Sequence, residues 1–151
     1  MAAMHIETPV GTLEVEEHEG AIVRLTWGRA REESPTPLLE EALRQIGAYF
    51  DGTLRDFDLP LAPAGNTFQQ SVHREMLAIP YGSTRSYGEI AERLSTYGQP
   101  VGQACGANPI PLIIPCHRVL SATGLGGYSG AGGLDTKIAL LKHEGGFPFL
   151  L

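Results

Sequence analysis

Alternation of apolar and polar residues marks the start of the chain. The pattern predicts two short strands within residues 5–16, on either side of a Pro-Val-Gly turn, and a third strand over residues 21–27. Strands joined by such short turns pair as an antiparallel sheet. Apolar residues then recur at helical spacing, which predicts a helix over residues 37–50 that ends at an Asp-Gly pair.

The rest of the chain predicts short helices separated by turns. Residues 58–66 are rich in proline and irregular, as is typical of a junction between lobes. Thr67 is expected to cap the helix that follows, and Ser86 with Glu89 matches the Ser-x-x-Glu capping box of the next one. Apolar spacing and capping residues together predict four helices, over residues 68–79, 87–94, 99–107 and 135–145.

These elements predict an α+β fold in two parts. Residues 1–64 would form an N-terminal lobe with a small antiparallel sheet and one helix, and residues 65–151 a mainly helical C-terminal lobe. The helices over 87–94 and 99–107 are joined by a tight turn, as in a helix-turn-helix. The second is built of small residues and glutamines and could approach a groove floor closely. A tightly packed interior helix would account for the same composition.

Charge is divided unevenly along the chain. The 151 residues carry a net charge of −6, yet residues 1–72 hold five arginines and twelve acids, whereas residues 73–151 hold six lysines and arginines and five acids. A polyanion would therefore meet the C-terminal half, through few phosphate contacts and partly through backbone N–H groups. No apolar run is long enough for a membrane span and no signal peptide is evident, so we expect no membrane association.

Cys116 is the candidate reactive residue. It lies between Pro115 and His117 at the end of an apolar run. A histidine can keep a neighbouring thiol partly ionised, and the thiolate is the reactive form. Cys105 is the only other cysteine, which gives no disulfide framework and favours a reducing compartment, the cytoplasm. A buried, inert cysteine is the alternative that this pair of neighbours leaves open.

Two further features accompany this cysteine. Residues 124–133 are rich in glycine but lack the Gly-Lys-Ser/Thr ending of a phosphate loop, so they would let the backbone approach a flat ligand or close a lid. Glu144 stands in the last turn of the final helix, where the helix dipole favours cations. A carboxylate placed against that preference indicates another role.

The segment from Asn108 to Val119 resembles the active-site signature of the O6-alkylguanine-DNA alkyltransferases, also called methylated-DNA–protein-cysteine methyltransferases. The similarity runs in family order from about residue 68 to 146 and includes the segments Phe68-Gln69-Gln70, Ile79-Pro80-Tyr81-Gly82, Ser86-Tyr87-Gly88-Glu89-Ile90-Ala91, Gly127-Tyr128-Ser129-Gly130 and Leu140-Leu141-Lys142-His143-Glu144-Gly145. The N-terminal residues match more loosely the family's ribonuclease H-like lobe.

The resemblance implies a DNA repair enzyme that flips a nucleotide and transfers the alkyl group of O6-alkylguanine to its own cysteine, with O4-alkylthymine as a further candidate substrate. The transfer would be irreversible and stoichiometric, because no residue or cofactor here could remove the thioether. The family docks the second helix of its helix-turn-helix in the minor groove of double-stranded DNA, which is about 6 Å wide. We expect a monomer without a cofactor.

The resemblance also implies roles for individual residues. Cys116 would be the nucleophile, His117 would take its proton through a water molecule, and Glu144 would orient His117. Asn108 would be the hinge before the active-site turn, and Tyr87 would bind the base and help to protonate the departing guanine. The base pocket would be lined by Val119, Tyr128, Ser129 and Pro111, and DNA would be contacted by Gln99, Gly102, Gln103, Arg118 and Ser86.

The sequence departs from the family at the recognition helix. Gln99 stands where family members usually carry an arginine that intercalates in place of the flipped base, and the turn before it is shorter. Slower flipping or weaker DNA binding would follow, unless Arg85 or Tyr97 fills the gap. Ala107 replaces a basic residue that usually contacts phosphate.

Three functions follow as alternatives. The first is the alkyltransferase, the second a lesion-binding sensor with weak or no transfer, and the third a transcriptional regulator that uses only the helix-turn-helix.

Three other groups of residues are not expected to take part in the chemistry. Some relatives hold a structural zinc ion in the N-terminal lobe, but here no cysteine precedes Cys105, and His5 and His18 are too few, so we expect no metal. Cys105 itself is expected to be a small packed hydrophobe rather than a second acceptor. His73 is expected to be a partly exposed helix residue.

Overall fold

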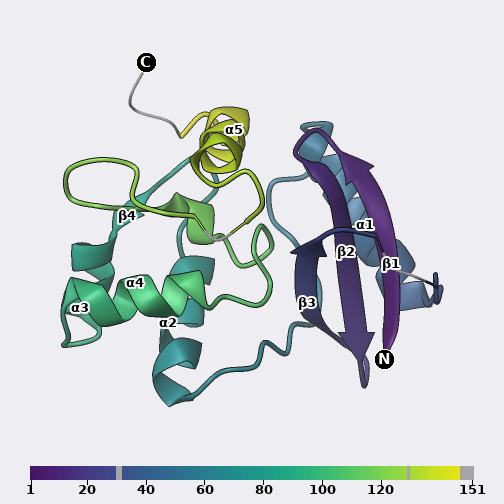
Figure 1. The fold of residues 1–151 in the computed structure, drawn as a ribbon, viewed down its shortest axis with the longest axis horizontal. Coiled ribbons are helices and arrows are strands. Elements are labelled where there is room, and N and C mark those ends of the chain that lie inside the picture. The colour runs from purple at the N-terminus through teal and green to yellow at the C-terminus, as the bar shows by residue number, and fades with distance from the viewer. Residues whose placement is uncertain (30–31, 129, 147–151) are drawn as a thin grey trace. The chain divides into compact units, whose positions relative to one another are not determined.

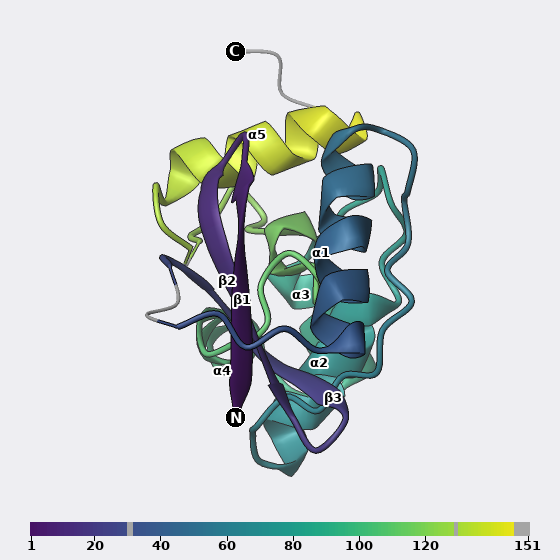
Figure 2. The same ribbon diagram turned by 90° about the vertical axis from the view of Figure 1, so that its right-hand side faces the viewer.

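The computed structural model describes residues 1–29, 32–128 and 130–146, and the chain forms two compact units, Met1–Ala64 and Gly65–Leu151. The first unit contains strands β1 (Ala2–Thr8), β2 (Gly11–His18) and β3 (Ala21–Trp27), followed by helix α1 (Pro37–Phe50). The strands pair in the order β1-β2-β3, antiparallel throughout. Helix α1 packs on one face of this sheet (Figures 1 and 2). The predicted meander and helix are therefore confirmed.

The sheet buries one face against α1. Leu13 and Val15 alternate inward from β2, whereas Ile22 and Leu25 on β3 are an odd number of residues apart and are both buried. The register between the two strands shifts at Glu16/Glu17, and such an irregularity lets both side chains reach the same face. The proline-rich junction then returns to β3, where Ile22 exchanges two backbone hydrogen bonds with residues 60 and 62.

The second unit contains the predicted helix-turn-helix. Its helices are α2 (Thr67–Leu77), α3 (Tyr87–Arg93), α4 (Gly98–Gly106) and α5 (Leu134–Glu144), with a one-turn 3-10 helix, η1 (Cys116–Arg118), between α4 and α5. Helix α4 packs against both α2 and α3, and α5 contacts η1 (Figure 1). Two short strands, β4 (Arg85–Ser86) and β5 (Val119–Leu120), pair in parallel and tie the start of α3 to the end of η1. The α+β class with two parts is thus confirmed.

Helix ends in this unit follow capping chemistry. Ser86 and Glu89 form the predicted capping box of α3. The cap of α2 is Asn66 and not Thr67, because the Asn66 side chain accepts a hydrogen bond from the backbone N–H of Gln69, and the Gln69 side chain accepts one from the backbone N–H of Asn66. Helix α5 ends at Gly145, whose φ of 72° is the left-handed conformation that glycine adopts without strain.

No helix among the described residues is both long and apolar enough to span a membrane.

Candidate active site

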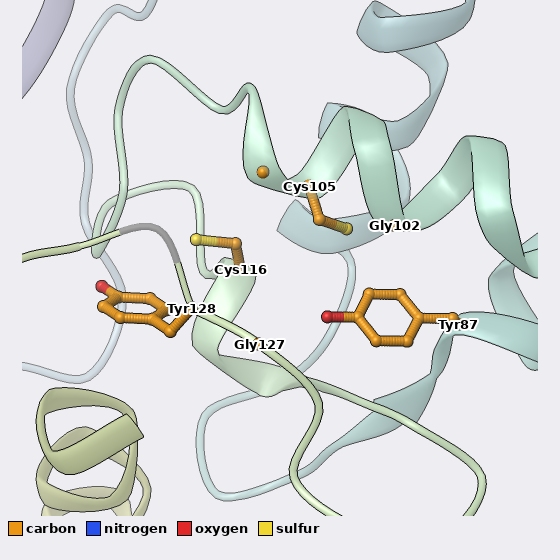
Figure 3. A pocket seen from close by; sticks show the side chains of 7 residues that line it. Tyr87, Gly102, Cys105, Cys116, Gly127 and Tyr128 are labelled. Atoms are coloured by element: carbon orange, nitrogen blue, oxygen red, sulfur yellow. The ribbon is translucent and has the colours of Figure 1, made fainter. Parts of the chain in front are cut away.

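A cavity of about 420 Å³ opens in the second unit around Cys116. Its walls come from the first residue of α3, the inner face of α4, η1 and the glycine-rich loop. The lining residues are Tyr87, Gly102, Cys105, Gly106, Cys116, Gly127 and Tyr128. Figure 3 shows Tyr87 and Tyr128 on opposite sides of Cys116. Two aromatic rings, a thiol and several positions without side chains make a space suited to a flat, largely apolar ligand.

The Cys116 thiol is held in a protonated resting form. Cys116 is the first residue of η1 and is only 5% exposed. Burial raises the pKa of its thiol to about 11, although a hydrogen bond from Asn108 and the positive charge of Lys137 act in the opposite direction. Because so little thiolate exists near neutral pH, reaction at this sulfur requires a base that takes its proton.

Asn108 fixes the turn that leads to Cys116. Its side-chain Nδ2 donates to the carbonyl oxygen of Ile114 at 2.9 Å, and its Oδ1 accepts from the backbone N–H of Ile110 at 3.0 Å. The enclosed turn includes Leu112, which is buried with a φ of 75°, a conformation that is strained for a residue with a side chain. The amide of Asn108 therefore holds the end of α4 and the approach to Cys116 in one arrangement.

Glu144 joins α5 to the residues that follow Cys116. Its Oε2 lies 2.8 Å from His117 Nε2, and both of its oxygens accept hydrogen bonds from Arg118, at 2.8 Å from Nε and 3.0 Å from Nη2. All three residues are buried. Burial alone would raise the pKa of Glu144, but the hydrogen bonds from His117 and Arg118 outweigh it and hold that pKa at about 2. Glu144 is therefore ionised at every physiological pH.

This network assigns the proton on His117. An ionised carboxylate only accepts hydrogen bonds, so Nε2 of His117 must carry the proton that faces Glu144. Burial lowers the pKa of His117, with the Glu144 hydrogen bond acting against it, which leaves the resting imidazole neutral. Its Nδ1 is then a free lone pair, and this buried atom has no hydrogen-bond partner within the described part of the chain. Nδ1 is therefore the atom of this network that can accept a proton.

Lys137 is a buried cation that the sequence pattern did not single out. Its side chain is fully buried, and its Nζ donates to the carbonyl oxygens of Val119 at 2.7 Å, Leu125 at 2.5 Å and Gly127 at 2.9 Å. Burial lowers its pKa to about 8, and the nearby Cys116 and Cys105 thiols oppose that shift. The three carbonyls span the loop between η1 and the cavity wall, so Lys137 fixes that wall.

The glycine-rich loop approaches Tyr87 very closely. A Cβ atom at Gly126 would lie 2.9 Å from Cε2 of the Tyr87 ring, and Gly126 has a φ of 71°. The neighbouring Gly127 backbone forms a hydrogen bond with the Tyr87 hydroxyl, which acts against the effect of burial in raising the pKa of Tyr87. Glycine is thus required at position 126, and the loop positions the phenol at the cavity.

The structure brings together most residues that the sequence selected for chemistry. Cys116, Tyr87, Tyr128 and Gly102 line one cavity, and His117, Glu144 and Asn108 support Cys116 as described. The backbone carbonyl of Val119 belongs to the Lys137 cluster, and Pro111 is buried in the turn held by Asn108. Ser129 lies outside the described residues.

The residues that the sequence selected for contact with DNA differ in their exposure and in their partners. Gln99 and Gln103 are exposed on α4, while the Ser86 hydroxyl is engaged as the cap of α3. Arg118 is not placed for a phosphate contact. It is buried, and its guanidinium is used by Glu144 and by the carbonyl oxygen of Ile79, at 2.7 Å from Nη1. Arg118 is a structural counter-ion for Glu144, because a buried carboxylate needs a paired charge.

Burial tests the expectations for Cys105 and His73. Cys105 is packed, with its Sγ 3.7 Å from Met76 Sδ, and burial raises its pKa to about 12, which suits an inert thiol at the cavity wall. His73 is 2% exposed, so the expectation of a partly exposed side chain is wrong. The helix α2 turns that residue inward beside Val72 and Met76.

Among the described residues, no group of three potential metal ligands is close enough to hold an ion.

Comparison with known proteins shows which protein family this chain matches. Residues 67–146 match the model of the 6-O-methylguanine DNA methyltransferase DNA-binding domain, and residues 3–63 match that of the 6-O-methylguanine DNA methyltransferase ribonuclease-like domain. A methylated-DNA–protein-cysteine methyltransferase of Methanosarcina acetivorans is 44% identical over 92% of this chain and 95% of its own length. The corresponding protein of Mycobacterium tuberculosis is 43% identical, over 92% and 89% of the two chains.

A solved crystal structure has a similar fold. The crystal structure of Mycobacterium tuberculosis OGT in complex with DNA superposes with a TM-score of 0.86 and 41% identity, covering 96% of this chain and 93% of that one.

Replacing Lys137 with methionine should weaken the fold. The variant Lys137→Met leaves three buried carbonyls without their charged donor, so we expect the free energy of unfolding to fall by at least about 2 kcal/mol. Chemical denaturation measures this change. Lys142→Met, an exposed lysine on the same helix, is the matched control and should stay within about 0.5 kcal/mol of the parent. Equal effects of the two substitutions would contradict the role of Lys137.

The Cys116 thiol should react with iodoacetamide in proportion to its thiolate fraction. In a Cys105→Ser background, the rate should rise about tenfold per pH unit from pH 7 to pH 10, because the pKa of Cys116 lies near 11. Mass spectrometry of the modified peptide at timed intervals gives the rate. A rate that levels off near pH 8 would show that the thiol is already ionised in the resting protein.

Proposed function

Because this chain belongs to the 6-O-methylguanine DNA methyltransferase family, we propose that it repairs DNA by moving the alkyl group of O6-alkylguanine onto Cys116. The observation that supports this most directly is the buried thiol in a base-sized cavity, next to a neutral imidazole whose free Nδ1 is buried. The product is a thioether, and no group at the site is suited to remove it. Each molecule therefore acts once.

The cavity favours a base taken out of the helix. A duplex hides O6 of guanine inside the stack, so the nucleotide must be extruded before Cys116 can reach the alkyl carbon. A purine would enter between Tyr87 and Tyr128, beside the loop backbone at Gly127 (Figure 3). Val119, Pro111 and Ser129 belong to the proposed surroundings of the base. O4-alkylthymine carries its alkyl group on an equivalent oxygen and is a second substrate of the same chemistry.

The transfer is a displacement at the alkyl carbon. His117 Nδ1 takes the thiol proton through a water molecule, and Cys116 Sγ attacks the carbon while the bond from that carbon to O6 breaks. The electron pair of that bond goes to guanine, which takes up a proton with the help of the Tyr87 hydroxyl. Tyr87 regains its proton from His117 by way of solvent, so the thiol proton ends on guanine and the enzyme keeps the alkyl group. Glu144 stabilises the imidazolium that forms in between.

The helix-turn-helix of α3 and α4 is the proposed DNA-binding surface. Helix α4 exposes Gln99, Gln103 and small residues, which suits entry into a minor groove about 6 Å wide. Double-stranded DNA with an alkylated base is the proposed partner, bound by a monomer. Few cations lie on this surface, so binding should depend only weakly on salt. The cytoplasm, where thiols stay reduced, is the expected location.

Intact mass after exposure to a lesion tests the proposal. An oligonucleotide duplex with one O6-methylguanine should add the mass of one methylene group to the Cys116 peptide, with one addition per molecule. Cys105→Ser should retain the gain and Cys116→Ser should lose it. Lesion-specific binding without a mass gain would instead support the sensor, for which the uncharged Gln99 is the motivating feature. Binding without any preference for the lesion would support the regulator.

Glu144→Gln should slow transfer by about 100-fold or more, because the imidazolium loses its carboxylate and general-base catalysis is weakened. The rate of methyl transfer from duplex to Cys116 is the measurement, made at a temperature where thermal unfolding shows that the variant is folded. Glu40→Gln, an exposed carboxylate on α1, is the control and should keep the parent rate. A folded Glu144→Gln protein with an unchanged rate would remove Glu144 from the mechanism.

A further inference from the structure

A large aromatic side chain stands at the start of the outer surface of α4, on the residue that precedes the helix. Gln99, Gln103 and Ala107 are exposed there, and none is charged. Tyr97, the N-cap residue, is 68% exposed. Among the described residues it is the only aromatic side chain with such exposure; the other exposed large apolar residues are Met1, Leu77 and Leu134.

Tyr97 immediately precedes Gly98, the first residue of α4. Gly98 lies on the same side of the helix as Gly102 and Cys105, which line the cavity, because these residues follow one another at spacings of four and three. A Cβ atom at Gly98 would lie 3.9 Å from Tyr87 Cβ, so the start of α4 is beside the tyrosine of the cavity wall. At 1.5 Å per residue, Tyr97 lies about 7.5 Å along the helix from Gly102, which is about two base steps of DNA.

No packing or capping contact within the described part of the chain accounts for an aromatic ring at this position. The side chain of Tyr97 makes no capping hydrogen bond to α4. Its ring is mostly in solvent and adds little to the packed core. An exposed tyrosine ring is, however, a large and rigid contact surface that loses little conformational freedom on binding.

Base extrusion creates a need for such a ring. When a nucleotide leaves the duplex, its neighbours lose their stacking partner, and proteins that act in the minor groove insert side chains to fill such a gap. The other candidates are less suitable. The Arg85 guanidinium is held by Glu75 at 3.8 Å and is largely covered, while Gln99 has an amide with a much smaller face. An aromatic side chain stacks on any base.

We propose that Tyr97 stacks into the gap that the flipped nucleotide leaves and so holds the extruded state of the DNA. The inference rests on the proposed function, because it supposes that a base enters the Cys116 cavity. Tyr97 is thus a DNA-positioning residue: it touches the bases that remain in the stack and does not touch the reacting atoms.

Two substrates separate this role from the chemistry at Cys116. A duplex with one O6-benzylguanine requires extrusion, whereas the free base O6-benzylguanine does not. We expect Tyr97→Ala to slow transfer from the duplex by about 10- to 100-fold, the range that loss of one base–aromatic stack gives, and to leave transfer from the free base unchanged. Tyr97→Phe keeps the ring and should react with both substrates at the parent rate. Leu77→Ala, another exposed apolar side chain, is the control for surface truncation and should also match the parent.

Each other outcome has a distinct meaning. An unchanged duplex rate in Tyr97→Ala would overturn the proposal, and so would an equal loss with the free base, since Tyr97 would then act through the cavity. A loss in Gln99→Ala without one in Tyr97→Ala would assign the gap to Gln99 instead. If the parent protein takes the benzyl group from neither substrate, the duplex comparison is made with O6-methylguanine. If that duplex also leaves Cys116 unmodified, the proposed function fails and this inference fails with it.

Discussion

The buried charge of Glu144 is the constraint on which the site depends. One carboxylate at the end of α5 accepts hydrogen bonds from both residues that follow Cys116 in η1, and Arg118 carries the connection on to the carbonyl of Ile79. A buried ion of this kind is tolerated only with its partners in place, because removing one leaves an uncompensated charge. The same contacts that make Glu144 acceptable in the interior therefore fix the tautomer of His117 and the position of η1, which begins at Cys116.

The electrostatics of the cavity favour a thiol that is inactive until substrate arrives. Burial raises the pKa of Cys116 and lowers that of His117, so the resting pair is uncharged. A thiolate would be open to oxidation and to adventitious alkylation, either of which would waste a protein that reacts once. In the proposed transfer, the ion pair that forms would be stabilised by Glu144, whose charge is already present. The network thus supplies its stabilisation when charge develops, at no cost of reorganisation.

Local signals in the sequence were sufficient for most of the fold. Helix α1 has the predicted bounds because apolar periodicity, a proline in its first turn and Asp-Gly after its end all agree. The residues that were misjudged are polar side chains whose surroundings come from distant parts of the chain. Arg118 reads as a surface cation, but its partner lies 26 residues away on α5. Lys137 has three backbone carbonyls as partners, and a carbonyl has no signature in sequence. His73 was predicted to be partly exposed, but it lies on the buried face of α2 together with Val72 and Met76.

Helix α4 shows why the composition of this chain is unusual just before the active site. Its inner face forms a wall of the cavity, where bulk would exclude a base, and its outer face is proposed to enter a narrow groove, where bulk would prevent docking. Both demands select small residues, and both leave the helix with weak intrinsic stability, since glycine costs about 1 kcal/mol in a helix interior relative to alanine. Packing of Val101 and Ala104 against α2 and α3 must offset that loss. A large aromatic side chain is compatible with these demands at the helix end, beyond the cavity wall, and Tyr97 is the N-cap residue there.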